Sequence, residues 1–148
     1  MVDILLELLS PRFDKIGTLF NTGKATWDIQ RMSFTIMDDP IVHHAISTMT
    51  YTSGSDYWIA IANANMGSVS KNDFGCSWKD IPYAEAWFMC SLIPALYNSE
   101  LDIPGFPLQH GDFHSQNIMV TDVESNNPHI TGVIDWDLTT TAPTSSFA

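Results

Sequence analysis

Six side chains that can bind a metal ion or accept a proton lie near the C-terminal end of this 148-residue sequence. The segment HGDFHSQNIMV, residues 110–120, places two histidines, an aspartate and an asparagine directly before an apolar run. The segment ITGVIDWD, residues 130–137, is a largely apolar run that ends with two carboxylates. Asp112 or Asn117 alone is typical of a turn. The set to be explained is His110, Asp112, His114, Asn117, Asp135 and Asp137.

The two apolar runs are expected to pair as a hairpin, with strands over Ile118–Thr121 and Ile130–Ile134. Such a hairpin brings Asp135 back beside Asn117, with Asp112 across a small gap. An amide oxygen next to a carboxylate suits Mg²⁺, which keeps its other positions for water and substrate phosphates. A second carboxylate that is not on the metal can accept a proton from an attacking hydroxyl. The pattern therefore predicts Mg²⁺-dependent phosphoryl transfer.

The elements that must position these residues are predicted to form an α+β domain, with helices first and a strand–loop–hairpin unit near the C-terminus. Residues 12–21 and 26–36 have the composition of strands joined by the turn NTGK, and a short strand is expected around Leu108. Residues 1–10 are expected to form a short helix ended by Pro11. A weaker helical pattern begins at Gly54.

The clearest helix is predicted over residues 80–99, bent near Pro94. It is apolar on nearly every face, so we expect it to be central and buried, with Tyr83, Trp87 and Phe88 in the core. The segment 138–148 is low in complexity and is expected to be frayed.

Composition excludes several classes of partner. The net charge is −11, with six lysines and arginines against seventeen carboxylates, which disfavours nucleic acid and an anionic membrane surface. The most apolar segment, residues 86–97, is shorter than the roughly 20 residues that a membrane span needs. Cys76 and Cys90 do not suggest a disulfide framework, so we expect a reducing, cytoplasmic location.

The spacing of His110, Asp112 and Asn117 matches the kinase catalytic-loop pattern H-x-D-x-x-x-x-N, and IDWD takes the place of the metal-binding D-F-G motif. Together, HGDFHSQNIMV and ITGVIDWD resemble the aminoglycoside phosphotransferase and choline kinase family. FDKIGTLF and GSDYW are similar to fungal members. Ser115-Gln116 replaces the Pro-Gly common in the family, which changes loop stiffness more than chemistry.

The resemblance implies a role for each matching residue. Asp112 is expected to be the catalytic base, and Asn117 and Asp135 the ligands of Mg²⁺ that carries ATP. His110 and His114 are expected to shape the loop through hydrogen bonds. Asp137 matches an acidic position of the motif, with its role open between an outer contact to the metal and structural support. The acceptor is expected to be a small molecule with a hydroxyl group, which the sequence does not specify.

The resemblance also implies a protein-kinase-like C-terminal lobe, mostly helical, with the hairpin beside its catalytic loop. No G-x-G-x-x-G loop is present, and none of the four lysines lies in a V-A-I-K-like strand. Residues 1–148 are therefore expected to be a single partial domain, the central part of that lobe, with the N-terminal lobe missing. We expect it to retain a metal site, to have little kinase activity alone, and to expose apolar surface that favours self-association.

Two alternatives remain open. In a two-metal hydrolase, His110, Asp112 and His114 would bind metal together with Asp135 and Asp137. That arrangement predicts tight binding of Zn²⁺ or Mn²⁺, whereas a kinase-like site binds Mg²⁺ weakly without nucleotide. The third possibility is a non-catalytic module that binds a nucleotide or a protein and shows no turnover.

Overall fold

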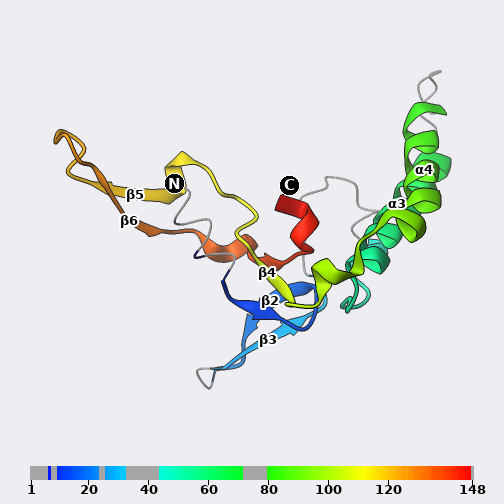
Figure 1. Ribbon diagram of the computed structural model, residues 1–148, viewed down its shortest axis with the longest axis horizontal. Coiled ribbons are helices and arrows are strands. Elements are labelled where there is room, and N and C mark those ends of the chain that lie inside the picture. The colour runs from blue at the N-terminus through cyan, green and yellow to red at the C-terminus, as the bar shows by residue number, and fades with distance from the viewer. Residues whose placement is uncertain (1–6, 8–9, 24–25, 33–43, 72–79, 148) are drawn as a thin grey trace.

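A computed structural model describes residues 7, 10–23, 26–32, 44–71 and 80–147 of the chain. The described part combines helices with antiparallel strands, so the α+β prediction is confirmed. Figure 1 shows the hairpin β5–β6 at one end, the helices α3 and α4 at the other, and the sheet that contains β2, β3 and β4 between them. The helix expected over residues 1–10 lies almost entirely outside the described residues.

A five-stranded antiparallel sheet forms the middle of the molecule, in the order β1-β4-β7-β2-β3. Its strands are β1 (Arg12–Phe13), β2 (Gly17–Asn21), β3 (Trp27–Gln30), β4 (Phe106–Gln109) and β7 (Thr140–Thr141). The strand expected over 12–21 is divided, because Ile16 leaves the sheet to bridge Tyr51. The second expected strand ends at Gln30, and its remaining residues from 33 onward lie outside the described part of the chain.

The expectation of a frayed segment at residues 138–148 is wrong for residues 138–147, the part of the segment that the structure describes. Strand β7 lies between β4 and β2, and Thr141 is completely buried. The Thr141 hydroxyl donates to the carbonyl of Lys15 at 2.7 Å and accepts from the amide of Gly17 at 3.0 Å. A threonine-rich segment of low complexity can therefore be the central strand of a sheet, since β-branched residues suit strands.

Helix α3 (Gly54–Lys71) confirms the helix expected from Gly54. Its inner face packs on two small apolar clusters. One contains Ile16, Tyr51 and Phe106, and the other contains Met32, Ile46 and Ile61. Phe106 belongs to the strand that leads into the polar loop, so this core fixes the base of the candidate site.

Helix α4 (Asp80–Leu96) contains Pro94 and is present as expected, but it is not a central buried helix. Its main neighbour is α3, and only Ala86 of its described side chains is fully buried. Tyr83, Trp87 and Phe88 are 43–56% exposed, so their assignment to the core is wrong. A helix that packs against one neighbour buries a single stripe, whatever the polarity of its other faces.

The 3₁₀ helix η1 (Ser99–Asp102) follows α4 and precedes β4. The Asp102 carboxylate accepts from the amide of Gly54 at 2.9 Å and from the hydroxyl of Tyr97 at 2.6 Å. Asp102 therefore ties the start of α3 to the end of α4. Among the described residues, no helix is both long and apolar enough to cross a membrane.

Candidate catalytic and metal-binding loop

The polar loop leaves the sheet at the end of β4. Phe106 and Pro107 are fully buried, and β4 pairs with β1 on one side and β7 on the other, so the strand is a rigid base. After the loop, the 3₁₀ helix η2 (Ser115–Asn117) leads directly into β5 (Ile118–Thr121). Residues 110–117 are thus held between two strands that belong to different sheets.

Gly111 is the one position of the loop that requires glycine. Its φ of +79° is a conformation that L side chains rarely adopt, and a Cβ here would overlap the carbonyl oxygen of Leu138. The chain after the hairpin therefore passes directly against the start of the loop. This close approach explains the glycine between His110 and Asp112 in physical terms.

His110 links the loop to the end of the hairpin. Its side chain is buried, and Nε2 donates to the carbonyl oxygen of Ile134 at 2.9 Å. The imidazole also packs against the rings of Phe113 and Trp136, at centroid distances of 5.8 and 4.7 Å. Nδ1 has no hydrogen-bond partner within the described part of the chain. Because Ile134 precedes Asp135, the position of His110 influences where Asp135 lies.

Asp112, His114 and Asn117 form one hydrogen-bonded group. The Asn117 amide nitrogen donates to the backbone carbonyl of Asp112 at 2.9 Å and to its Oδ2 at 3.3 Å. His114 Nδ1 accepts from the amide of Gln116 at 3.1 Å, which caps η2, and Nε2 lies 3.2 Å from Asp112 Oδ2. The same Nε2 atom lies 3.4 Å from the Asn117 amide nitrogen, so the His114 ring contacts both of the other two side chains.

This group leaves two oxygen atoms available. Asn117 is buried and uses its amide nitrogen toward Asp112, so its amide oxygen is not engaged by that bond. Asp112 is held through Oδ2, while Oδ1 has no hydrogen-bond partner among the described residues. The side chain of Asp112 is 43% exposed, so a substrate can reach it. A fixed, accessible carboxylate is what a proton acceptor requires.

The hairpin β5–β6 forms as the sequence predicts, with β6 at His129–Val133 and a bulge between Met119 and Val120. Ile118 pairs with Val133, and the amide of Ile134 donates to the carbonyl of Asn117 at 3.0 Å. The backbone of Asn117 is therefore hydrogen-bonded to the residue immediately before Asp135. The ribbon returns Asp135 to the same end of the hairpin as the loop.

Asp135 itself has a left-handed backbone, with φ 64° and ψ 61°, and precedes the 3₁₀ helix η3 (Trp136–Leu138). Residues other than glycine adopt this conformation at a cost, and such positions concentrate at functional sites. Its side chain is exposed and makes no hydrogen bond or ion pair with any described residue. The carboxylate is thus free for an external ligand.

The oxygen donors fit Mg²⁺ by their chemistry. One amide oxygen and one unpaired carboxylate are the few protein ligands that Mg²⁺ takes when phosphates and water complete its coordination. The described residues contain no group of three or more His, Cys, Asp or Glu side chains placed to hold a metal ion. The five-ligand arrangement of the two-metal hydrolase is therefore not assembled.

Asp137 lies on η3 and, like Asp135, has no hydrogen-bond or ion-pair partner among the described residues. It lines a hollow on the sheet side of η3. Sequence patterns assigned no role to Trp136. Its indole nitrogen donates to the carbonyl of Val133 at 2.8 Å, and its ring packs on His110. The position of an aromatic residue between the two aspartates of IDWD was the available signal.

Comparison with known proteins finds a family match, and it covers the segment that carries the candidate site. Residues 106–145 match the model of a phosphotransferase enzyme family, from β4 through the loop, the hairpin and β7. No curated protein and no solved structure matches the chain significantly. The similarity supports a phosphotransferase-like ancestry for the segment that carries the candidate site.

Proposed function

We propose that the loop 110–117 and Asp135 form the centre of a phosphotransferase that transfers the γ-phosphoryl group of Mg·ATP to a hydroxyl of a small molecule. The observation that carries the proposal is the hydrogen-bonded group of Asp112, His114 and Asn117, joined through the backbone of Ile134 to Asp135. The family match to the same residues supports it. A protein-kinase-like C-terminal lobe of fungal type is the finer assignment within this proposal.

In this proposal Asp112 accepts the proton of the acceptor hydroxyl. His114 holds Oδ2, which leaves Oδ1 to face the alcohol. Asn117 and Asp135 bind Mg²⁺, which neutralises charge on the phosphates of the nucleotide. His110 positions Asp135 through the carbonyl of Ile134. Asp137 supports the same region from η3.

The first experiment measures metal and nucleotide binding by isothermal titration. We expect Mg²⁺ to bind weakly alone and more tightly when ATP is present, because the phosphates complete its coordination. Asp135→Asn removes a charged ligand and should lower the affinity for Mg·ATP by about tenfold or more, which corresponds to a loss of about 1.4 kcal/mol or more of binding free energy.

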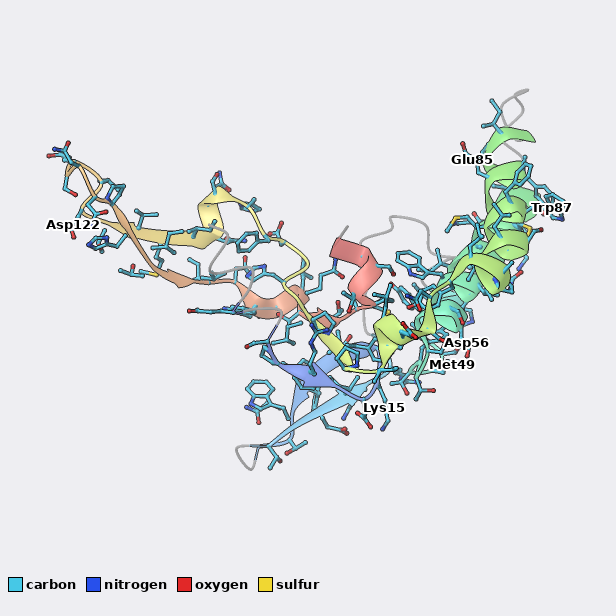
Figure 2. All side chains as sticks on the ribbon, viewed as in Figure 1. Lys15, Met49, Asp56, Glu85, Trp87 and Asp122 are labelled. Atoms are coloured by element: carbon cyan, nitrogen blue, oxygen red, sulfur yellow. The ribbon has the colours of Figure 1, made fainter. Side chains whose placement is uncertain are left out.

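Asp122→Asn is the matched control. Asp122 also has a positive φ, of 56°, and lies at the far tip of the hairpin, away from the loop (Figure 2). Its replacement should leave binding unchanged. Tight binding of Zn²⁺ or Mn²⁺ without nucleotide, lost in His110→Ala and His114→Ala, would favour the hydrolase instead.

The second experiment measures transfer of labelled γ-phosphate. The sequence contains no glycine-rich loop and no V-A-I-K-like lysine, so we expect the 148-residue chain alone to have little activity. Where activity is present, Asp112→Asn should lower it by about a hundredfold or more, the usual contribution of a general base. Robust transfer by the chain alone would contradict the expectation of low activity. Unchanged transfer by Asp112→Asn would contradict the assigned base.

A further inference from the structure

A hollow of about 700 Å³ lies between the sheet and η3, separate from the hydrogen-bonded loop group. Small-molecule sites are commonly of this size. Its described lining comes from β1, β2, β3 and β4 on one side and from η3 and the residue after it on the other: Phe13, Leu19, Trp27, Leu108, Trp136, Asp137 and Thr139. None of these side chains belongs to the proposed metal or proton-transfer set except Asp137, whose role there is open.

The walls are aromatic and apolar. Trp27 is 59% exposed at the start of β3, and Trp136 is 39% exposed on η3. Trp136 already satisfies its indole nitrogen through the carbonyl of Val133 at 2.8 Å, so it offers the hollow only apolar ring surface. Two indoles with accessible surface in one hollow favour a ligand with a flat or ring-shaped apolar body.

The charge of the hollow is negative. Asp137 is the charged residue among its described lining groups, and its carboxylate has no partner in the described part of the chain. The whole chain carries a net charge of −11, which further disfavours an anion. A cation gains from the carboxylate and from the faces of the indoles together.

We propose that this hollow binds a small organic cation with an aromatic or similarly flat apolar body. The body lies against Trp27 and Trp136, and the cationic group pairs with Asp137. This inference does not depend on phosphoryl transfer, because it requires neither metal nor nucleotide. It is therefore tested separately from the proposed function.

The test uses three probes that share one ring: 2-phenylethylammonium, 2-phenylethanol and 3-phenylpropanoate. Binding is followed by the NMR signals of the tryptophan indole N–H groups, assigned by single Trp→Phe variants, without metal or ATP. We expect the signals of Trp27 and Trp136 to shift, with the ammonium binding at least tenfold more tightly than the carboxylate. The signal of Trp87, which lies on α4 at the helical end of the molecule and away from the sheet, should not move (Figure 2).

Two variants separate charge from ring contact. Asp137→Asn should lower the affinity for the ammonium to that for the alcohol, while the affinity for the alcohol stays the same. Trp27→Ala should weaken all three probes, and because Trp27 is exposed the indole spectrum should otherwise remain that of the folded chain. Trp87→Ala and Asp122→Asn are the controls and should change neither affinity.

Equal affinity for the ammonium and the carboxylate would overturn the proposal. So would an ammonium affinity that Asp137→Asn leaves unchanged, or shifts confined to tryptophans outside the hollow. If Asp137→Asn does not fold, the probe series on the unaltered chain and on Trp27→Ala still decides between a cation site and a non-specific apolar surface.

Discussion

At the scale of single residues, the loop depends on contacts that use the backbone as much as the side chains. His110 donates to a carbonyl, His114 accepts from an amide, and Asn117 donates to a carbonyl. These bonds hold the loop without consuming the Asp112 Oδ1 or Asp135 oxygens. The fixed residues therefore position the oxygens that do the proposed chemistry.

Gly111 gives the sharpest residue-scale prediction. Gly111→Ala should destabilise the fold by about 1–3 kcal/mol, because it combines an unfavourable φ with overlap at the carbonyl of Leu138. Chemical denaturation measures the change. Gly67→Ala is the control: a Cβ there meets nothing within 4 Å inside α3, and alanine should stabilise the helix by about 0.5–1 kcal/mol. Equal effects of the two substitutions would contradict the assigned close approach.

At the scale of elements, the central position of β7 makes the segment after IDWD part of the site's scaffold. It pairs with β4, which starts the loop, and with β2. The proposed metal ligand Asp135 is thus followed within a few residues by a strand that is anchored on both sides. This placement limits how far η3 can move.

Thr141→Val tests that anchoring. Valine keeps the shape but loses the bonds to the Lys15 carbonyl and the Gly17 amide, so stability should fall by about 1–3 kcal/mol. Thr121→Val, at the exposed end of β5, should change it by less than about 0.5 kcal/mol. Thermal and denaturant unfolding report both. Similar small effects at the two positions would mean that the Thr141 hydroxyl does not stabilise the sheet.

The link between α3 and α4 predicts a pH dependence. Burial, and then the hydrogen bond to Asp102, raises the pKa of Tyr97 above its usual range. Burial also raises the pKa of Tyr51 and Tyr57. The unfolded chain therefore releases these protons at lower pH than the folded chain, so stability should be present in full below the ordinary tyrosine pKa of about 10 and fall as pH rises above it.

Unfolding free energies measured from pH 8 to 11 check this expectation. Tyr97→Phe should make the decline shallower without removing it, because Tyr51 and Tyr57 still contribute. A stability that rises through this range would contradict the assigned direction.

At the scale of the whole molecule, α4 differs most from its prediction: the helix was expected to be central and buried, but it exposes an apolar face. Trp87, Phe88 and Leu92 of α4 are 48–56% exposed, and α4 lies at one end of the molecule (Figure 1). Contiguous apolar surface of this kind favours association. We expect the chain to self-associate with rising concentration, as the sequence analysis expected for a partial domain that exposes apolar surface.

Sedimentation and light scattering over a range of concentrations measure that association. The double substitution Trp87→Ser and Leu92→Ser should shift it to at least tenfold higher concentration, because it removes apolar area from the face. Ile103→Ser is the control, since Ile103 is 82% exposed but lies outside the helix. A chain that stays monomeric throughout, or an equal effect of the control, would contradict the role of α4.

Short-range patterns in the sequence were enough to predict the strands, the hairpin and the loop, because these depend mainly on residues that are close in the chain. Strand-like composition and turn residues predicted β2, β3 and the hairpin. The spacing of Asp112 and Asn117 predicted a loop in which the two side chains meet, because five residues of tight loop cannot separate them far. The metal and base roles of these residues remain predictions. Only the tertiary structure decided which apolar segments are buried. Helix α4 stays exposed because it has one main neighbour, while the plain threonine segment at 139–141 enters the sheet because its backbone completes the pairing of β4 with β2. Burial depends on which partners the whole chain brings to a segment, and the composition of the segment alone does not contain that information.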